Sequence, residues 1–329
     1  MIRFIKKNYK VIIIYIILFI ALTIEFPYYV EAPGGIIDVK DRINIESSYD
    51  SSGSFNLAYV SEYKGTIPMF IISLFNKDYK VLKKNDILMD NQSFNDYELR
   101  DKLLLKEAYS SAIYVGYNKA GKKINIISEE LYVDYIFEDS DTNLKVGDKI
   151  INVDNTLVSS REDIDNILVN HNIGDNIEIK VINNNKEYIR TSKLINYQDK
   201  PIIGISVVKI KNMDTDPKIS INYHSHESGP SGGLMLALSI YNDLVEEDIT
   251  HGLKIVGTGT IDYDGNVGSI GGVEYKLLTA VKNKADLFIV PNGENYESVI
   301  NEKNKKNYKI DIIGVDNIDE VIEYLKKRN

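Results

Sequence analysis

Hydrophobic and polar positions follow different periods along the chain, and the first segment is almost wholly apolar. Residues 11–24 carry no charge, although they are fewer than the roughly 20 residues that cross a bilayer. The aromatic residues Tyr28 and Tyr29 suit a membrane interface and would extend the span to about residue 30. Cations precede the run: Arg3, Lys6, Lys7 and Lys10. The pattern predicts a cytoplasmic tip and a transmembrane helix over residues 1–30.

The position of these cations also predicts a topology. Because they all lie on the N-terminal side, that end should face the cytoplasm, with the rest of the chain outside the cell membrane as a single-pass protein. Two alternatives remain. A cleaved signal peptide has an apolar region of about 7–15 residues, but no small-residue cleavage site follows here. A buried core helix fits poorly behind a cluster of cations.

The next segment shows strand-like and then helix-like periods. Residues 36–75 alternate enough to predict strands. A helix is predicted from about residue 95 to 119, with Asn95 as its cap and Gly121 as its stop. The apolar stripe of this helix consists of Leu99, Leu103, Tyr109 and Ile113. We therefore expect a mixed strand and helix region over residues 31–121.

Residues 122–198 have a shorter, β-rich pattern. Two strand-like runs, INIIS and LYVDYIF, open it. The helix that begins after Ser160 has Asp163 in its third position, as in a weak capping box. A terminal hairpin turns at Asn184 and Asn185, residue types that tolerate the positive φ of a tight turn. The pattern predicts a small module of strands with one short helix.

Strands and helices alternate from residue 199 to 329, which predicts an α/β domain. DLFIVP is strand-like, whereas SGGLMLALSIYNDLVE and EYKLLTAVKNKA are helix-like. The segment DYDGNVG, from Asp262, has the alternating oxygens of a calcium loop. Its twelfth position is Val273 and not a bidentate glutamate, so we predict a hairpin turn instead. The last helix opens with Asn317 and Glu320 at capping-box spacing.

Composition narrows the range of functions. A chain of 329 residues is too long for one ordinary core, which favours several domains. The net charge of −9 argues against nucleic acid as the main partner. The absence of cysteine excludes disulfides, thiolate chemistry and cysteine-based zinc sites. No G-x-x-x-x-G-K-[ST] occurs, so this chain encodes no ATPase motor, and we expect neither a cofactor nor a metal.

The stretch GPSGG is the strongest chemical signal. Ser231 precedes an apolar helical run, so it would lie at a helix N-terminus, where free amides and the positive dipole end can hold an anion. Gly229 and Gly232 permit the tight backbone and the close substrate approach that an oxyanion hole needs. The alternative is that Ser231 is only a helix cap after a Gly-Pro turn.

A serine nucleophile also needs a base. GPSGG matches the G-x-S-x-G elbow of α/β-hydrolases, but that fold needs an acid and then a histidine after the serine, and only His251 follows, too early. His224 and His226 precede the serine and, as a metal pair, lack partners. Lys276 lies on a predicted helix among apolar residues. Only a neutral lysine accepts a proton. Desolvation lowers a lysine pKa, and a partly buried site can supply a fall of roughly two to three pH units. The alternative for such a lysine is an ordinary surface charge.

GPSGG followed at this spacing by TGTI, D-G, IGG and a lysine resembles the Lon-type serine–lysine peptidase domain over roughly residues 200–325. The resemblance implies that Ser231 is the nucleophile, Lys276 the general base and Thr258 a hydroxyl that supports the lysine. The matching positions are Gly229, Pro230, Ser231, Gly233, Thr258, Gly259, Ile261, Gly265, Val267, Ile270, Gly271, Gly272, Lys276 and Ala280. Two positions depart from the family: Ser228, where ATP-dependent members often have an acid, and Gly232, where alanine is common.

Residues 122–198 resemble a PDZ domain, a module that captures an extended peptide beside a strand. The matching positions are Leu144, Gly147, Asp148, Ile150, Ile151, Val153 and Asp154. The glycine-rich loop that holds a peptide carboxylate is missing from the acidic segment 137–144. The alternative is a structural β-module that binds no ligand.

The order of anchor, PDZ-like module and Lon-type domain resembles the membrane-anchored, ATP-independent Lon-like PDZ proteases of Gram-positive and related bacteria, and YYVEAPGG is part of the likeness. This implies an α+β multidomain protein that hydrolyses peptide bonds in flexible peptides or unfolded proteins, which the PDZ-like module presents. Lon-type domains elsewhere form rings, so a homo-oligomer is a further expectation. The alternative function is a catalytically silent scaffold that binds cell-envelope peptides.

Overall fold

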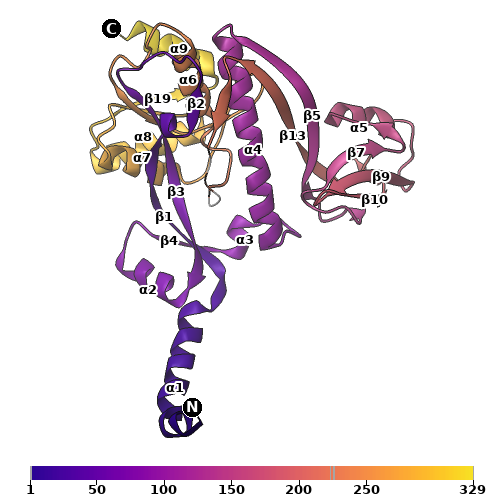
Figure 1. Cartoon of the computed structure of the whole chain (residues 1–329), viewed down its shortest axis with the longest axis vertical. Coiled ribbons are helices and arrows are strands. Elements are labelled where there is room, and N and C mark those ends of the chain that lie inside the picture. The colour runs from indigo at the N-terminus through magenta and orange to yellow at the C-terminus, as the bar shows by residue number, and fades with distance from the viewer. Residues whose placement is uncertain (1, 223, 225–226, 329) are drawn as a thin grey trace.

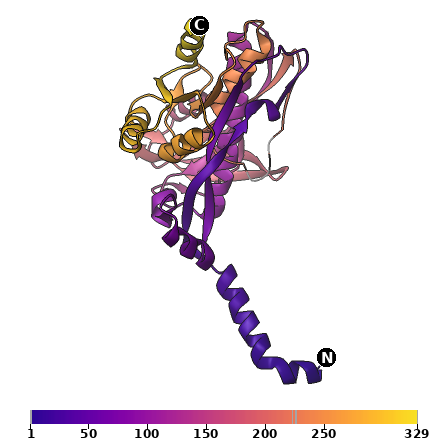
Figure 2. The ribbon, with the colours of Figure 1, turned by 90° about the vertical axis from the view of Figure 1, so that its left-hand side faces the viewer.

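Three parts make up the chain: a main body around a six-stranded sheet, a β-rich lobe beside it, and an N-terminal helix that projects away from the body (Figure 1). A second view shows the same projection (Figure 2). The computed structural model describes residues 2–222, 224 and 227–328. The helices are α1 (Ile2–Thr23), α2 (Ile67–Phe75), α3 (Lys84–Ile87), α4 (Phe94–Lys119), α5 (Arg161–Leu168), α6 (Gly233–Leu244), α7 (Val273–Lys282), α8 (Glu294–Lys306) and α9 (Ile318–Lys327).

Strands from both ends of the chain build the main sheet, in the order β19-β18-β15-β3-β1-β4. These strands are β1 (Glu25–Asp38), β3 (Ser54–Thr66), β4 (Lys80–Lys83), β15 (Lys254–Gly257), β18 (Leu287–Pro291) and β19 (Asp311–Val315). The junction is the parallel pairing of β3 with β15, in which Phe55 lies opposite Ile255. The sequence pattern separates residues 31–121 from 199–329, whereas this pairing joins the two regions in one sheet. Periodicity shows that a segment is a strand but not which strand pairs with it.

Helix α6 lies at the centre of the body. Every one of its residues is buried, including the polar residues Ser239, Asn242 and Asp243, so it is a core helix. It packs against α4, and the two helices approach closely at Gly116. A Cβ at this position would lie 2.6 Å from Cγ2 of Ile240, so only glycine permits the contact. This packing fixes the position of α6, and Ser231 lies in the turn before its first residue.

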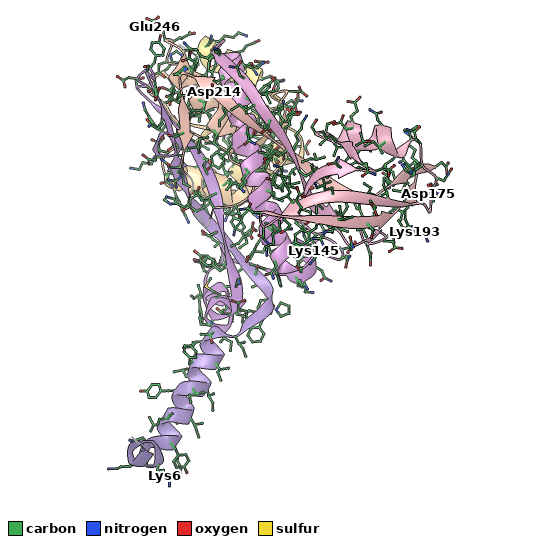
Figure 3. The ribbon with its side chains drawn as sticks, turned by 45° about the vertical axis from the view of Figure 1, so that its right-hand side comes forward. Lys6, Lys145, Asp175, Lys193, Asp214 and Glu246 are labelled. Carbon is green, nitrogen blue, oxygen red and sulfur yellow. The ribbon has the colours of Figure 1, made fainter. Side chains whose placement is uncertain are left out.

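The β-rich lobe contains a seven-stranded sheet in the order β13-β5-β7-β9-β10-β6, with β8 beside β7. Its strands are β5 (Lys123–Ile136), β6 (Asp141–Thr142), β7 (Lys149–Val153), β8 (Thr156–Leu157), β9 (Asn176–Asn183), β10 (Lys186–Lys193) and β13 (Ile205–Asp216). It has a hydrophobic core of its own, separate from that of the body. Figure 3 shows Lys145, Asp175 and Lys193 on the lobe, beside the main body.

Two local predictions for this lobe are confirmed. The Ser160 side chain accepts the N–H of Asp163 at 3.1 Å, and the Asp163 carboxylate accepts the N–H of Ser160 at 2.9 Å, so the capping box is complete. Asn184 and Asn185 both have positive φ, as the β9–β10 hairpin requires.

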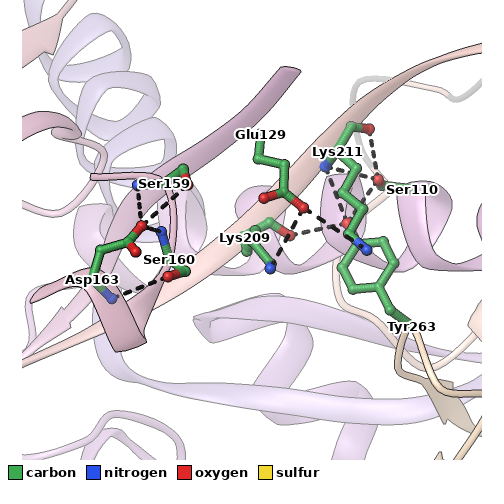
Figure 4. A network of polar contacts seen from close by, with 8 residues as sticks. All are labelled: Ser110, Glu129, Ser159, Ser160, Asp163, Lys209, Lys211 and Tyr263. Atoms are coloured by element: carbon green, nitrogen blue, oxygen red, sulfur yellow. Dashed lines mark hydrogen bonds and ion pairs between the residues drawn. The ribbon is translucent and has the colours of Figure 1, made fainter. Parts of the chain in front are cut away.

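The long ribbon of β5 and β13 connects the lobe to the body, and α4 fastens it (Figures 1 and 4). The Ser110 hydroxyl on α4 accepts the N–H of Lys211 at 3.1 Å and lies 2.8 Å from the Lys211 carbonyl. The Tyr263 hydroxyl donates to the carbonyl of Lys209 at 3.0 Å. These side chains satisfy the outer edge of β13, where another strand would otherwise pair.

Short strands complete the fold: β2 (Ile43–Ile45) pairs with β14 (Ile219–Ile221), β11 (Ile195–Tyr197) with β12 (Lys200–Ile202), and β16 (Thr260–Ile261) with β17 (Val267–Gly268). The hairpin predicted at Asp262 is therefore confirmed. The Asp262 carboxylate accepts the N–H groups of Asp264 and Asn266 at 2.9 and 2.8 Å, so its oxygens serve the turn itself.

Two boundary predictions are wrong. Residues 67–75 form the helix α2 and not a strand, because Thr66 caps it and Pro68 occupies its first turn. The cap of α4 is Ser93 and not Asn95: its hydroxyl accepts the N–H of Asp96 at 3.2 Å, and the Asp96 carboxylate accepts the N–H of Ser93. The predicted cap of the last helix is confirmed, since Asn317 accepts the N–H of Glu320 at 3.1 Å.

The N-terminal helix does not support the predicted transmembrane segment. The chain enters β1 at Glu25, and Tyr28 and Tyr29 pair there with β4, although the prediction placed them at a membrane interface. The charge-free part of α1, residues 11–23, rises about 20 Å at roughly 1.5 Å per residue, against a hydrocarbon core of about 30 Å.

Among the described residues, no helix is both long enough and apolar enough to cross a membrane. The prediction of a transmembrane helix over residues 1–30 is therefore wrong. The predicted single-pass cell-membrane topology, with a cytoplasmic N-terminus and an extracellular catalytic domain, is wrong for the same reason.

Candidate active site

Ser231 lies in the turn that leads into α6. Gly229 has a φ of +82°, a conformation that a residue with a side chain rarely adopts, and its N–H donates to the carbonyl of Asp101 on α4 at 3.1 Å. Gly232 is the N-cap of the helix. Within the described part of the chain, the backbone N–H groups of Ser231 and Gly232 have no acceptor. Two amides at a helix N-terminus are thus free to bind an anion.

Lys276 is the only lysine in α7 whose side chain is enclosed, with 2% of the residue exposed. It lies on the apolar face of the helix with Val273, Leu277 and Ala280, all of which are buried. Its Nζ donates to the hydroxyl of Thr258 at 3.1 Å. Burial lowers the pKa of Lys276 to about 8, although the negative charge of Glu31 acts in the opposite direction. A substantial fraction of such a lysine is neutral near pH 8.

Thr258 joins the lysine to the serine turn. Its hydroxyl donates to the carbonyl of Ser231 at 3.0 Å, and the N–H of Gly259 donates to the same carbonyl at 2.8 Å. The carbonyl of Gly259 in turn accepts the N–H of Leu234 at 3.1 Å. The segment after β15 therefore clamps the first turn of α6. Within the described residues, the Ser231 hydroxyl makes no hydrogen bond to Lys276, a contact that often forms only when substrate is bound.

The structure gives a physical account of both departures from the Lon-type pattern. Ser228 replaces an acid, but the carboxylate of Asp101 lies 3.9 Å from the point where a Cβ of Gly229 would be. An acid thus lies beside the Gly-Pro pair, supplied by α4. Burial raises the pKa of Asp101 to about 6. At Gly232, a Cβ would lie 3.2 Å from Leu57, so alanine would require Leu57 to shift.

The histidines near Ser231 are placed only in part. His226 lies outside the described residues. His224 follows β14, and its N–H lies 3.3 Å from the Glu227 carboxylate. His251 lies in a turn before β15, where its Nε2 is 3.0 Å from the carbonyl of Leu325. His251 therefore contacts α9 and not the serine turn.

Two acidic residues beside this site are not predictable from the sequence. Asp101 comes from the middle of α4 and Glu31 from β1. Each is far from GPSGG in the sequence and belongs to no spaced motif. Glu31 belongs to the segment YYVEAPGG, which is part of the resemblance to a known family. That resemblance assigns no function to Glu31.

Comparison with known proteins identifies the family. The Lon protease (S16) C-terminal proteolytic domain matches residues 146–327, which is more than half of the chain. The chain therefore belongs to the Lon protease C-terminal domain family. The predicted serine–lysine positions, Ser231 and Lys276, both lie within the matched range.

Lon proteases are among the similar proteins. The chain is 29% identical over 138 residues to the Lon protease of Campylobacter jejuni, covering 38% of this chain and 17% of that protein. It is 28% identical over 161 residues to the Lon protease of Clostridioides difficile, covering 45% of this chain and 20% of that protein. The chain thus spans at most about a fifth of the length of these relatives.

Solved PDZ domains resemble part of the chain. The PDZ domain of the SdrC-like protein from Listeria monocytogenes aligns with 22% identity and a TM-score of 0.24, covering 26% of this chain and 93% of that domain. The second domain of a Listeria innocua protein aligns with 31% identity and a TM-score of 0.22, covering 26% of this chain and 88% of that domain. These TM-scores are low, and the lobe is described as PDZ-like on its own strands, short helix and core.

Proposed function

We propose that this chain is a serine endopeptidase in which Ser231 is the nucleophile and Lys276 the general base. One observation carries the proposal: an enclosed lysine with a lowered pKa is hydrogen-bonded to Thr258, which is bonded to the carbonyl of Ser231. Family membership supports the same activity.

In the proposed reaction, neutral Lys276 takes the proton of the Ser231 hydroxyl as the serine oxygen attacks the peptide carbonyl. The C–N bond then breaks, and the Lys276 ammonium returns the proton to the leaving amine. A water molecule hydrolyses the resulting acyl-enzyme by the same proton transfers. Thr258 holds Nζ near the serine, because its hydroxyl bonds to both residues.

The oxyanion of the tetrahedral intermediate needs donors. The free N–H groups of Ser231 and Gly232 lie at the N-terminus of α6, where the helix dipole also favours negative charge. We assign them this role. Gly229 contributes its left-handed conformation, which shapes the turn before the nucleophile.

Flexible peptides and unfolded proteins are the proposed substrates. The chain has no nucleotide-binding loop of the G-x-x-x-x-G-K-[ST] type, so we propose that hydrolysis needs no ATP. The PDZ-like lobe is attached to the body by the β5–β13 ribbon and would present such segments to the site. The alternative is a catalytically silent scaffold that binds peptides, and the following experiment distinguishes it from a peptidase.

Labelling with a fluorophosphonate tests the nucleophile. We expect the wild-type chain to react at one serine, and Ser231→Ala to lose the label entirely, because the reagent requires an activated hydroxyl. Ser228→Ala is the matched control, since it alters a serine three positions away, and it should label like the wild type. A wild-type chain that neither labels nor cleaves an unfolded protein would support the scaffold instead.

The pH dependence tests the base. Because only neutral lysine accepts a proton, kcat/KM should rise about tenfold per pH unit up to a midpoint near pH 8 and then level off. Hydrolysis of a fluorescently labelled unfolded protein between pH 5.5 and about 10 would measure this. A profile that is flat across this range would exclude Lys276 as the base.

A further inference from the structure

Glu31 approaches the base from the opposite end of the chain. It lies in β1, opposite Glu62 of β3 and Lys80 of β4, and it is half-buried. Its carboxylate is held against the start of α7, the helix that carries Lys276.

Gly272 makes this approach possible. It is the N-cap of α7, with a φ of +63°, and a Cβ there would lie only 2.8 Å from Oε1 of Glu31. Its carbonyl accepts the N–H of Lys276 at 3.2 Å, so Lys276 follows one helical turn later. Glycine is therefore suited to this position for two reasons. It adopts the positive φ at the helix start, and it has no Cβ to collide with the Glu31 carboxylate.

The charges around this pair come from four elements. Among the described residues, Glu31 from β1 is the charged group that acts on Lys276. Glu31 itself experiences Glu62 of β3, Lys80 of β4 and Glu274 of α7. Burial and then Glu62 raise the pKa of Glu31, whereas Lys80 and Lys276 lower it.

We infer that Glu31 is a positioning residue for the base: its carboxylate, held at Gly272, is the counter-charge for the ammonium that Lys276 becomes when it takes the proton of Ser231. The inference depends on the proposed function, because it concerns the same proton transfer. An ammonium enclosed by protein is unstable without a partner of opposite charge. Glu31 thus makes Lys276 a stronger base than burial alone would leave it.

Replacing Glu31 with glutamine should move the pH profile. Without the carboxylate, Lys276 loses its proton more easily, so the midpoint of activity should fall by roughly half a pH unit or more. A weaker base also transfers the proton more slowly, so the alkaline plateau should fall several-fold. A merely structural defect would lower the whole profile without moving its midpoint.

The experiment measures the rate of fluorophosphonate labelling from pH 5.5 to about 10, with thermal unfolding as a check on folding. Glu31→Asp keeps the charge and should keep the midpoint within about 0.3 pH units of the wild type. Glu274→Gln is the matched control, since it removes one exposed charge from the first turn of α7 and should leave the midpoint unchanged because solvent screens it.

Each outcome decides the matter. A lower midpoint in Glu31→Gln alone supports the inference. Equal midpoints in Glu31→Gln and the wild type overturn it while the serine–lysine function stands. If Glu31→Gln does not fold, Glu31→Ala takes its place: a midpoint below that of the wild type supports the inference, and a midpoint equal to that of the wild type overturns it. A wild-type chain that does not label at any pH removes the proposed function and the inference together.

Discussion

Lys276→Met is expected to reduce peptide hydrolysis by about 1,000-fold or more, with the fold intact. Methionine has a similar length and no group that accepts a proton, so the Ser231 hydroxyl loses its base. The change also removes the bond from Nζ to Thr258, but Thr258 still donates to the Ser231 carbonyl and keeps the turn in place. Hydrolysis of a labelled unfolded protein at pH 8.5 provides the measurement.

The same helix offers a matched control for this variant. Lys282 lies at the exposed end of α7, where it pairs with Asp78 at 3.5 Å. Lys282→Met removes the same charge from the same helix and should retain the wild-type rate. If Lys276→Met keeps more than about a tenth of the wild-type activity, another residue is the base.

The same substitution should have a second large effect: it lowers the activity but is expected to increase the stability of the fold. Lys276→Met is expected to raise the free energy of unfolding at pH 7 by about 1–3 kcal/mol. Lowering the lysine pKa from about 10.4 in the unfolded chain to about 8 in the fold costs roughly 3 kcal/mol below pH 8. Losing the Thr258 hydrogen bond and leaving Glu31 without its partner offset part of this gain.

The stability difference between Lys276→Met and the wild type should depend on pH. Between pH 8 and about 10.4, the unfolded chain binds more protons at residue 276 than the folded chain, so the wild type gains stability as pH rises. Methionine has no proton to lose. The stability advantage of Lys276→Met should therefore be largest at or below pH 7 and shrink toward pH 10, as urea unfolding of both proteins at several pH values would show.

Lys282→Met again serves as the control. As an exposed pair, Lys282 and Asp78 contribute little, so the variant should differ from the wild type by less than about 0.5 kcal/mol at every pH. An advantage of Lys276→Met that does not vary with pH would show that the lysine does not titrate between pH 8 and 10.

Both predictions have the same cause, which is the burial of Lys276. In the proposed mechanism, burial makes Lys276 available as a base because it removes the solvent that stabilises the ammonium, and the same desolvation weakens the fold. Glu31 offsets part of the loss of stability, because its negative charge stabilises the ammonium of Lys276.

Local patterns in the sequence were sufficient for most elements. Ser160 with Asp163 and Asn317 with Glu320 predicted their helix starts, because a cap acts over three or four residues. The Asn184–Asn185 turn was predictable for the same reason. Residues 67–75 were not, because ISLF and its neighbours satisfy a strand pattern as well as a helix pattern, and the Thr66 cap decided the outcome.

The apolar N-terminal run shows the limit of composition. Residues 11–24 have the hydropathy of a membrane segment, but whether a helix spans depends on where it ends. Pairing of β1 with β3 and β4 sets that end at Thr23, and the partners of the first β1 residues, such as Thr66 for Glu25 and Lys83 for Tyr28, lie about 40 to 55 residues away. The residues next to the apolar run therefore do not reveal where the helix ends.

The sequence by itself was sufficient to propose Ser231, Thr258 and Lys276 as the residues of a serine–lysine peptidase, because two spaced motifs carry them. Only the tertiary structure decided what surrounds them. Desolvation, which lowers the pKa of Lys276, arises when α7 packs against the sheet, and the two nearby acids, Glu31 and Asp101, come from β1 and α4. Charge acts through space and burial is collective, so neither leaves a spacing that the sequence can show.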